Sequence, residues 1–313
     1  MEILFTCLTT NYNVMKKHWK ENSVLKKDGK IGTNKPIGRN IYLGGLLVRF
    51  DWKKKKIIST KEISCPSGFD LKNNLIYVSS MRENKIYILD NNFRIQGEIN
   101  NPYFNDLHSL NLSNRGILVT STGLDAILEV DDKGKILFDW WATDNGFIKD
   151  QYGTPRKIDK SISHNNINYL TLFQTTHINS AIYSTDAEET IFASLFHQGN
   201  IISIDVKSKN IDILLKGMRN QHSIYPLASG EFIVSNTRSN EIFIFNINGK
   251  IIRKIGVDFG WIQDSIELSN ENILVADSNN HKLVEIDYNG NEISVFNYPD
   301  NWRIYQVKET INY

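Results

Sequence analysis

A strand pattern that recurs about every 40 residues constrains the fold of this chain more than any other feature. Each unit contains short runs rich in β-branched and aromatic residues, for example 231–234 with 241–244 and 272–275 with 282–286. Turn pairs such as Asn248-Gly249 suit the tight hairpin between the last two strands of a unit. A unit of this length is what a four-stranded blade needs, so the sequence predicts an all-β propeller.

Six residues mark corresponding points of successive units. They are Ser67, His108, His177, His222, Asp264 and Arg303, with separations of 41, 69, 45, 42 and 39 residues. An insertion at about 142–170 accounts for the one long interval, and a second insertion falls at about 11–40. Long loops in compact domains are usually functional or mobile. Both segments are therefore candidates to cover one mouth of the central channel, with ordinary surface loops as the alternative.

The first and last segments of the chain together supply the strands of one blade. Residues 303–308 read as one strand with no partner after it, whereas the N-terminus supplies three strands at 2–6, 46–50 and 57–61. Joining these strands leaves no long exposed sheet edge. We therefore expect residues 1–313 to form a single six-bladed propeller domain, with its first blade closed by the C-terminal strand.

Three histidines at the start of consecutive units give the main functional signal. His108, His177 and His222 each begin or precede a strand, and Asp264 takes the same place in the next unit. The innermost strand of a blade lines the channel, so these side chains are expected to converge at one end of the axis. Three imidazoles with an open position form a common zinc site and also suit iron or copper. Asp264 would then be a fourth ligand or would orient one ring.

The same residues have readings without a metal. One imidazole would act as nucleophile or general base while the others hold an anionic group. Alternatively, all three would bind water and satisfy neighbouring backbone groups. Asp264 and Arg303 would then form either part of the site or an ion pair across the channel.

Composition excludes several classes of function. The chain of 313 residues is 41% hydrophobic and has a net charge of +1, which argues against a nucleic-acid partner. It contains no apolar run long enough for a membrane span. Cys7 and Cys65 lack the spacing of a metal site, and the N-terminus lacks the pattern of a secretion signal. We expect a cytoplasmic protein that acts on a small molecule and has neither a nucleic-acid nor a membrane partner.

Residues 67–250 resemble the arylsulfotransferase-like propellers, the PAPS-independent aryl sulfotransferases and their relatives. The resemblance is carried by the strand at His108, by 125–140, and by the segments His177-Ile178-Asn179, Phe196-His197-Gln198 and Gln221-His222. In that family a His-x-Asn pair, an Arg-His-Gln segment and a Gln-His pair build the site, and the last histidine carries the sulfuryl group.

The resemblance implies a role for each matching residue. His222 corresponds to the nucleophile, His177 and Asn179 to its anion-binding partners, and His108 to a further histidine of the channel. Phe196 stands where the family has an arginine, and a phenyl ring neither binds sulfate oxygens nor neutralises charge. His197 is expected one strand outward, in a supporting position.

Three functions therefore follow from the sequence. The first is a small-molecule enzyme with a divalent transition metal (iron, copper or zinc) held by His108, His177 and His222, with Asp264 as possible fourth ligand. The second is an arylsulfotransferase-like transfer through a His222 intermediate, with His177, Asn179 and His108 in support. The third is a non-catalytic propeller that binds a ligand or partner.

Overall fold

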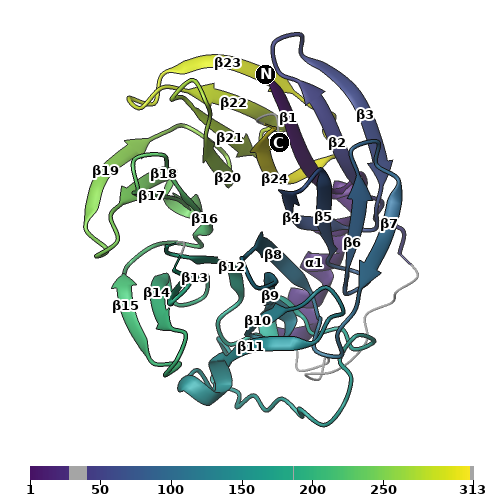
Figure 1. Cartoon of the computed structure of the whole chain (residues 1–313), viewed down its shortest axis with the longest axis vertical. Helices are drawn as coiled ribbons and strands as arrows, with labels where there is room; N and C mark the ends of the chain where they lie inside the picture. The colour runs from purple at the N-terminus through teal and green to yellow at the C-terminus, as the bar shows by residue number, and fades with distance from the viewer. Residues whose placement is uncertain (28–40, 186, 311–313) are drawn as a thin grey trace.

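The computed structural model describes residues 1–27, 41–185 and 187–310, which form six four-stranded sheets around a central axis (Figure 1). The prediction of an all-β, six-bladed propeller is confirmed. Five sheets are built from consecutive antiparallel strands: β4 (Pro66–Lys72), β5 (Leu75–Ser80), β6 (Lys85–Asp90) and β7 (Ile95–Ile99); β8 (Leu107–Leu112), β9 (Ile117–Ser121), β10 (Ala126–Val130) and β11 (Ile136–Trp141); β12 (Ile178–Tyr183), β13 (Thr190–Leu195), β14 (Asn200–Asp205) and β15 (Ile211–Leu215); β16 (His222–Pro226), β17 (Phe232–Asn236), β18 (Glu241–Phe245) and β19 (Ile251–Gly256); and β20 (Ile262–Glu267), β21 (Ile273–Asp277), β22 (Lys282–Ile286) and β23 (Glu292–Asn297).

The sixth sheet joins the two ends of the chain, as predicted. Its order is β24-β1-β2-β3, formed by β24 (Arg303–Glu309), β1 (Glu2–Thr9), β2 (Leu46–Asp51) and β3 (Lys56–Glu62). β1 and β24 pair antiparallel and lie side by side in Figure 1. Because the C-terminal strand is innermost, the last residues of the fold reach the axis rather than the surface.

Every inner strand begins with an irregularity. The pairing of each innermost strand with its neighbour shifts register near its start, in β4, β8, β12, β16, β20 and β24. In four blades a residue one or two positions before this shift has a positive φ, namely Cys65, Asp106, His177 and Asn220. Bulges of this kind re-aim side chains, so strict strand alternation does not predict which residues face the channel.

The first insertion contains the helix α1 (Tyr12–Lys27), which the strand pattern did not predict. The rest of this insertion, 28–40, lies outside the described residues. Short 3₁₀ turns follow strands or precede the inner strand at η1 (Thr122–Leu124), η2 (Ala142–Asn145), η3 (Thr171–Phe173) and η4 (Thr237–Ser239). Within the described ranges, no helix is long and apolar enough to cross a membrane.

Ring closure gives the first testable prediction. Ile304 of β24 is 0% exposed and packs with Ile3 and Val307, so Ile304→Ala should cost about 2–5 kcal/mol of unfolding free energy. Ile293→Ala is the control, since that side chain is 55% exposed and should change stability by less than about 0.5 kcal/mol. Urea unfolding measures both. Equal effects of the two substitutions would contradict a packed closing strand.

Candidate functional site

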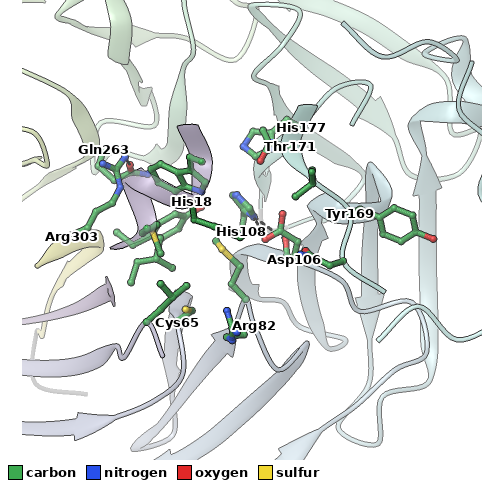
Figure 2. Close-up of a pocket in the computed structure, with 18 of the residues that line it drawn as sticks. His18, Cys65, Arg82, Asp106, His108, Tyr169, Thr171, His177, Gln263 and Arg303 are labelled. Carbon is green, nitrogen blue, oxygen red and sulfur yellow. Dashed lines mark hydrogen bonds and ion pairs between the residues drawn. The ribbon is translucent and has the colours of Figure 1, made fainter. Parts of the chain in front are cut away.

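A cavity of about 440 Å³ occupies one mouth of the channel (Figure 2). Met15, His18 and Trp19 of α1 line it from one side, and residues 168–172 at the end of the second insertion line it from another. The channel contributes His108, His177 and His222 together with Gln263, Arg303 and Tyr305, while the remaining lining residues are mostly apolar. The three predicted histidines therefore share one cavity at one end of the axis.

Hydrogen bonds between blades define which residues are equivalent. The hydroxyls of Thr122, Thr237 and Ser278 donate to the carbonyls of Ile178, Ile262 and Ile304 in the following blade, at 2.5, 2.7 and 3.0 Å. The backbone N–H groups of Ala181, Ile224 and Val307 are held in the same way by side chains of Ser109, Ser180 and Asp264. These two sets of bonds fix a common register for the inner strands.

This register corrects half of the predicted repeat positions. The equivalents of Ser67 and His108 are Asn179, His222, Gln263 and Tyr305, with separations of 41, 71, 43, 41 and 42 residues along the chain. His177 and Arg303 lie two residues before their repeat positions, and Asp264 lies one residue after. The cavity is therefore lined by two positions of the repeat that lie two residues apart, one with His108 and His222 and the other with His177 and Arg303.

Each histidine is held through Nδ1 by groups of its own or a neighbouring turn. His108 Nδ1 lies 2.8 Å from the carbonyl of Asp106, and His222 Nδ1 lies 3.0 Å from the carbonyl of Asn220 and 2.8 Å from Thr237 Oγ1. His177 Nδ1 bonds to Gln174 Oε1. The carbonyl and amide oxygens can only accept a hydrogen bond. The Thr237 oxygen also accepts from His222, because its own hydrogen is donated to the Ile262 carbonyl. Nδ1 therefore carries the proton, and Nε2 is left with a lone pair.

A buried carboxylate holds the turn before His177. Asp125 accepts the backbone N–H groups of Thr175, Thr176 and His177 at 2.7, 2.8 and 2.8 Å, and Arg156 of the second insertion pairs with it at 3.1 Å. This clamp stabilises the positive φ of 48° at His177. Sequence reasoning missed Asp125, although its place inside a strand-connecting turn was a signal.

Burial keeps two of the imidazoles neutral. It lowers the pKa of His222 to about 3, with the charge of Arg303 as the next cause. Burial also lowers the pKa of His177 well below its ordinary value, assisted by His108, His197 and His222. Both rings are therefore neutral at any ordinary pH.

The geometry does not favour the predicted metal centre. The rings of His108 and His177 meet edge to face with centroids 4.8 Å apart, but the Phe196 ring contacts both His177 and His222, at 4.8 and 5.3 Å. Among the described residues, no group of three or more His, Cys, Asp or Glu side chains is arranged to hold a metal ion. The divalent metal stays a prediction that this arrangement does not support.

Asp264 does not line the cavity. Its Oδ2 accepts the Val307 N–H at 2.7 Å and lies 3.4 Å from the Tyr225 hydroxyl, so it joins β20 to the closing strand. Burial raises the pKa of Asp264 to about 7. The alternative of an Asp264–Arg303 ion pair is not found among the described residues. The two residues hold repeat positions three apart, and their side chains bond to different partners.

Two residues implied by the family resemblance lie beside the cavity instead of on its wall. Asn179 donates to the Gln221 carbonyl at 2.9 Å and lines a smaller cavity deeper in the channel, of about 20 Å³. His197 stacks on His177 with ring centroids 5.4 Å apart and bonds to Gln151 and the Thr171 carbonyl. His197 therefore lies beside His177, as expected, but in the turn after β13 and not in a strand, and its supporting role stays a prediction.

Arg303 supplies a cation to the cavity; the sequence had left it open between a place in the site and an ion pair with Asp264. It is 6% exposed and lines the cavity beside Gln263, whose Oε1 accepts from it at 2.8 Å (Figure 2). Its other hydrogen-bond partner is the hydroxyl of Tyr12 in α1. Arg303 thus supplies the cavity with a cation from β24, while Phe196, at the position where the resembling family has an arginine, supplies none.

Comparison with known proteins supports the fold. No protein-family model and no curated protein matches the chain. A virginiamycin B lyase from Staphylococcus aureus is similar with a TM-score of 0.53 at 12% identity, over 75% of this chain and 70% of the lyase. A periplasmic gluconolactonase from Pseudomonas aeruginosa gives 0.53 at 11%, over 97% and 99%.

A chain from a nidogen/laminin complex gives a TM-score of 0.63 at 11% identity, over 98% of this chain and 97% of that one. None of these three structures is an arylsulfotransferase, so that resemblance stays a prediction. Identities this low show the six-bladed propeller fold alone.

The protonation of His222 gives the second prediction. NMR of ¹⁵N-histidine-labelled protein should show an Nδ1–H tautomer with unprotonated Nε2 down to pH 5, because burial holds the pKa near 3. The unfolded ring takes up a proton below about pH 6.5, so the neutral ring's stability contribution is lost as the pH falls, by on the order of 1 kcal/mol per unit. His222→Gln should reduce this slope. Protonation of folded His222 near pH 6.5 would contradict the burial argument.

Proposed function

We propose that this protein is a small-molecule enzyme that transfers a group through Nε2 of His222. The observation that carries the proposal is the fixed, neutral imidazole: two acceptors hold Nδ1–H, and the ring lines a cavity of substrate size. A nucleophile must be unprotonated and must reach its substrate. The held Nδ1–H leaves Nε2 unprotonated, and the ring lines the cavity in which a substrate would bind.

The reaction has two balanced steps. The Nε2 lone pair attacks the electrophilic atom of the donor, and the bond to the leaving oxygen breaks with its electron pair on that oxygen. An acceptor hydroxyl or water then displaces His222 and returns the lone pair to Nε2. The proton that the acceptor loses equals the one that the leaving oxygen gains, so no oxidant or other co-reactant is needed.

The surroundings of His222 suit such an intermediate. Once Nε2 is substituted the ring becomes cationic, and the carbonyl of Asn220 and hydroxyl oxygen of Thr237 stabilise its Nδ1–H. The low pKa of His222 also makes the ring a good leaving group in the second step. The resemblance to arylsulfotransferases favours a sulfuryl group as the one transferred.

His108 and His177 are proposed as proton-transfer partners. Both line the same cavity, and both have Nδ1 occupied, which leaves Nε2 for the leaving oxygen or the acceptor hydroxyl. His18 of α1 also lines the cavity, and burial lowers its pKa.

The structural neighbours allow both an enzyme and a binding protein. A histidine-to-alanine variant of the staphylococcal lyase is described as catalytically inactive, with quinupristin present. Together with the gluconolactonase, it illustrates small-molecule chemistry on this fold, whereas the nidogen/laminin chain favours a second candidate, a partner-binding propeller.

The experiment for the proposed function is covalent capture. Protein mixed with 4-nitrophenyl sulfate, 4-nitrophenyl phosphate or 4-nitrophenyl acetate should release nitrophenolate and gain the mass of one transferred group on His222. His222→Gln should lower the rate by about 10³-fold or more, as expected for loss of a nucleophile. Peptide mass spectrometry locates the group.

His197→Gln is the matched control, because His197 touches the ring of His177 and lies away from the cavity wall. It should keep the label on His222. A label that persists in folded His222→Gln, or no label with any of the three donors, would count against the group transfer and favour the binding protein.

A further inference from the structure

We propose that Arg303 forms a built-in oxyanion site in the cavity, which takes the sulfate, phosphate or carboxylate group of a ligand. This deepens the proposed function but can be tested apart from it, since anion binding does not require His222 to react. The site lies in the cavity at the mouth of the channel, between α1 and the start of β24.

The charge of Arg303 lacks a counter-charge. Its two hydrogen-bond acceptors are Tyr12 Oη and Gln263 Oε1, both uncharged, and in the described parts of the chain it has no ion-pair partner. A guanidinium that is 6% exposed without a carboxylate is costly. Such a residue is best explained by an anion that arrives with the ligand.

Aromatic rings hold the guanidinium without using up its donors. Its central carbon lies 5.0, 5.6 and 5.9 Å from the ring centroids of Tyr12, Trp19 and Trp261. Cation–π contacts of this kind offset part of the desolvation cost. The rings contribute no hydrogen-bond acceptor through their faces, and two of five N–H groups have acceptors among the described residues. The remaining donors are available to an oxyanion.

Gln263 fixes the orientation of the Arg303 guanidinium. Its Oε1 accepts from Arg303 at 2.8 Å and from Trp261 Nε1 at 3.1 Å, so one neutral oxygen positions both side chains. A carboxylate at this position would neutralise Arg303 permanently. Glutamine instead preserves the positive charge for a ligand, and this is the feature that separates a binding site from an internal ion pair.

The oxyanion site is coupled to His222. Arg303 is the largest charge that lowers the pKa of His222, and the Trp261 ring contacts His222 with centroids 5.6 Å apart. An oxyanion on Arg303 would cancel this effect, so anion binding and a positive charge on the imidazole favour each other. A ligand with its anionic group on Arg303 would occupy the cavity that His222 also lines.

The test is binding of inorganic sulfate to the full-length protein at constant ionic strength, followed by tryptophan fluorescence and calorimetry. Gln263→Glu is the informative variant, because it supplies an internal carboxylate to Arg303 and keeps the side-chain shape. It should weaken sulfate binding at least tenfold without lowering the melting temperature. Arg303→Met should also weaken binding at least tenfold.

Arg82→Met is the matched control, since Arg82 is a second cation on the cavity wall and lies apart from Arg303 in Figure 2. It should change sulfate affinity less than threefold. Unchanged binding in Gln263→Glu, or loss of binding in Arg82→Met alone, would overturn the assignment. If Arg303→Met does not fold, Gln263→Glu decides.

His222→Gln distinguishes the two proposals. It should bind sulfate as the wild type does while it loses covalent labelling. Sulfate should also raise the NMR-measured pKa of His222 in the wild type and leave it unchanged in Gln263→Glu. Sulfate binding without any covalent label would retain the oxyanion site and reject group transfer through His222.

Discussion

The pairing of β24 with β1 is the interaction on which the rest of the structure depends. It closes six sheets into a ring, so no blade has to expose its inner strand to water, and it joins residues about 300 positions apart, such as Thr6 and Gln306. The same pairing carries Arg303 to the axis and sets it under Tyr12 of α1. Fold closure and assembly of the cavity are therefore one event.

The period of the strands was predictable from sequence because it reflects local chemistry. β-Branched runs and Asn-Gly turns recur whatever the tertiary contacts, and they give the number of blades and the closing strand. The exact repeat positions were not predictable by counting. A bulge at the start of each inner strand shifts the side-chain direction, so His177, Asp264 and Arg303 were placed one or two residues from their true equivalents.

The site was predictable in part for the same reason. Histidines near the start of an inner strand reach the channel from either of two repeat positions, so His108, His177 and His222 were found despite the shifted register. The surroundings of Arg303 could not be predicted, because its hydrogen-bond acceptors Tyr12 and Gln263 come from segments far from it in the sequence. From the sequence, Asp264 was a candidate ion-pair partner for Arg303. In the structure Asp264 accepts the Val307 N–H of the closing strand instead. The helix α1, with Tyr12 and Trp19, gave no sign in the strand pattern.

His222 and Arg303 line the same cavity but are stabilised by opposite kinds of surroundings. Burial of a neutral imidazole favours a dry, apolar wall, whereas burial of a guanidinium without a carboxylate favours an anion. The protein meets the first demand with Phe196 and Trp261 around His222, and meets the second only in part, with aromatic faces and a neutral amide around Arg303. An anionic ligand would satisfy Arg303 and at the same time remove the repulsion that resists positive charge on His222. An anion bound to Arg303 would therefore lower the cost of a positive charge on His222, while burial of the ring, the larger cause of its low pKa, would still oppose that charge.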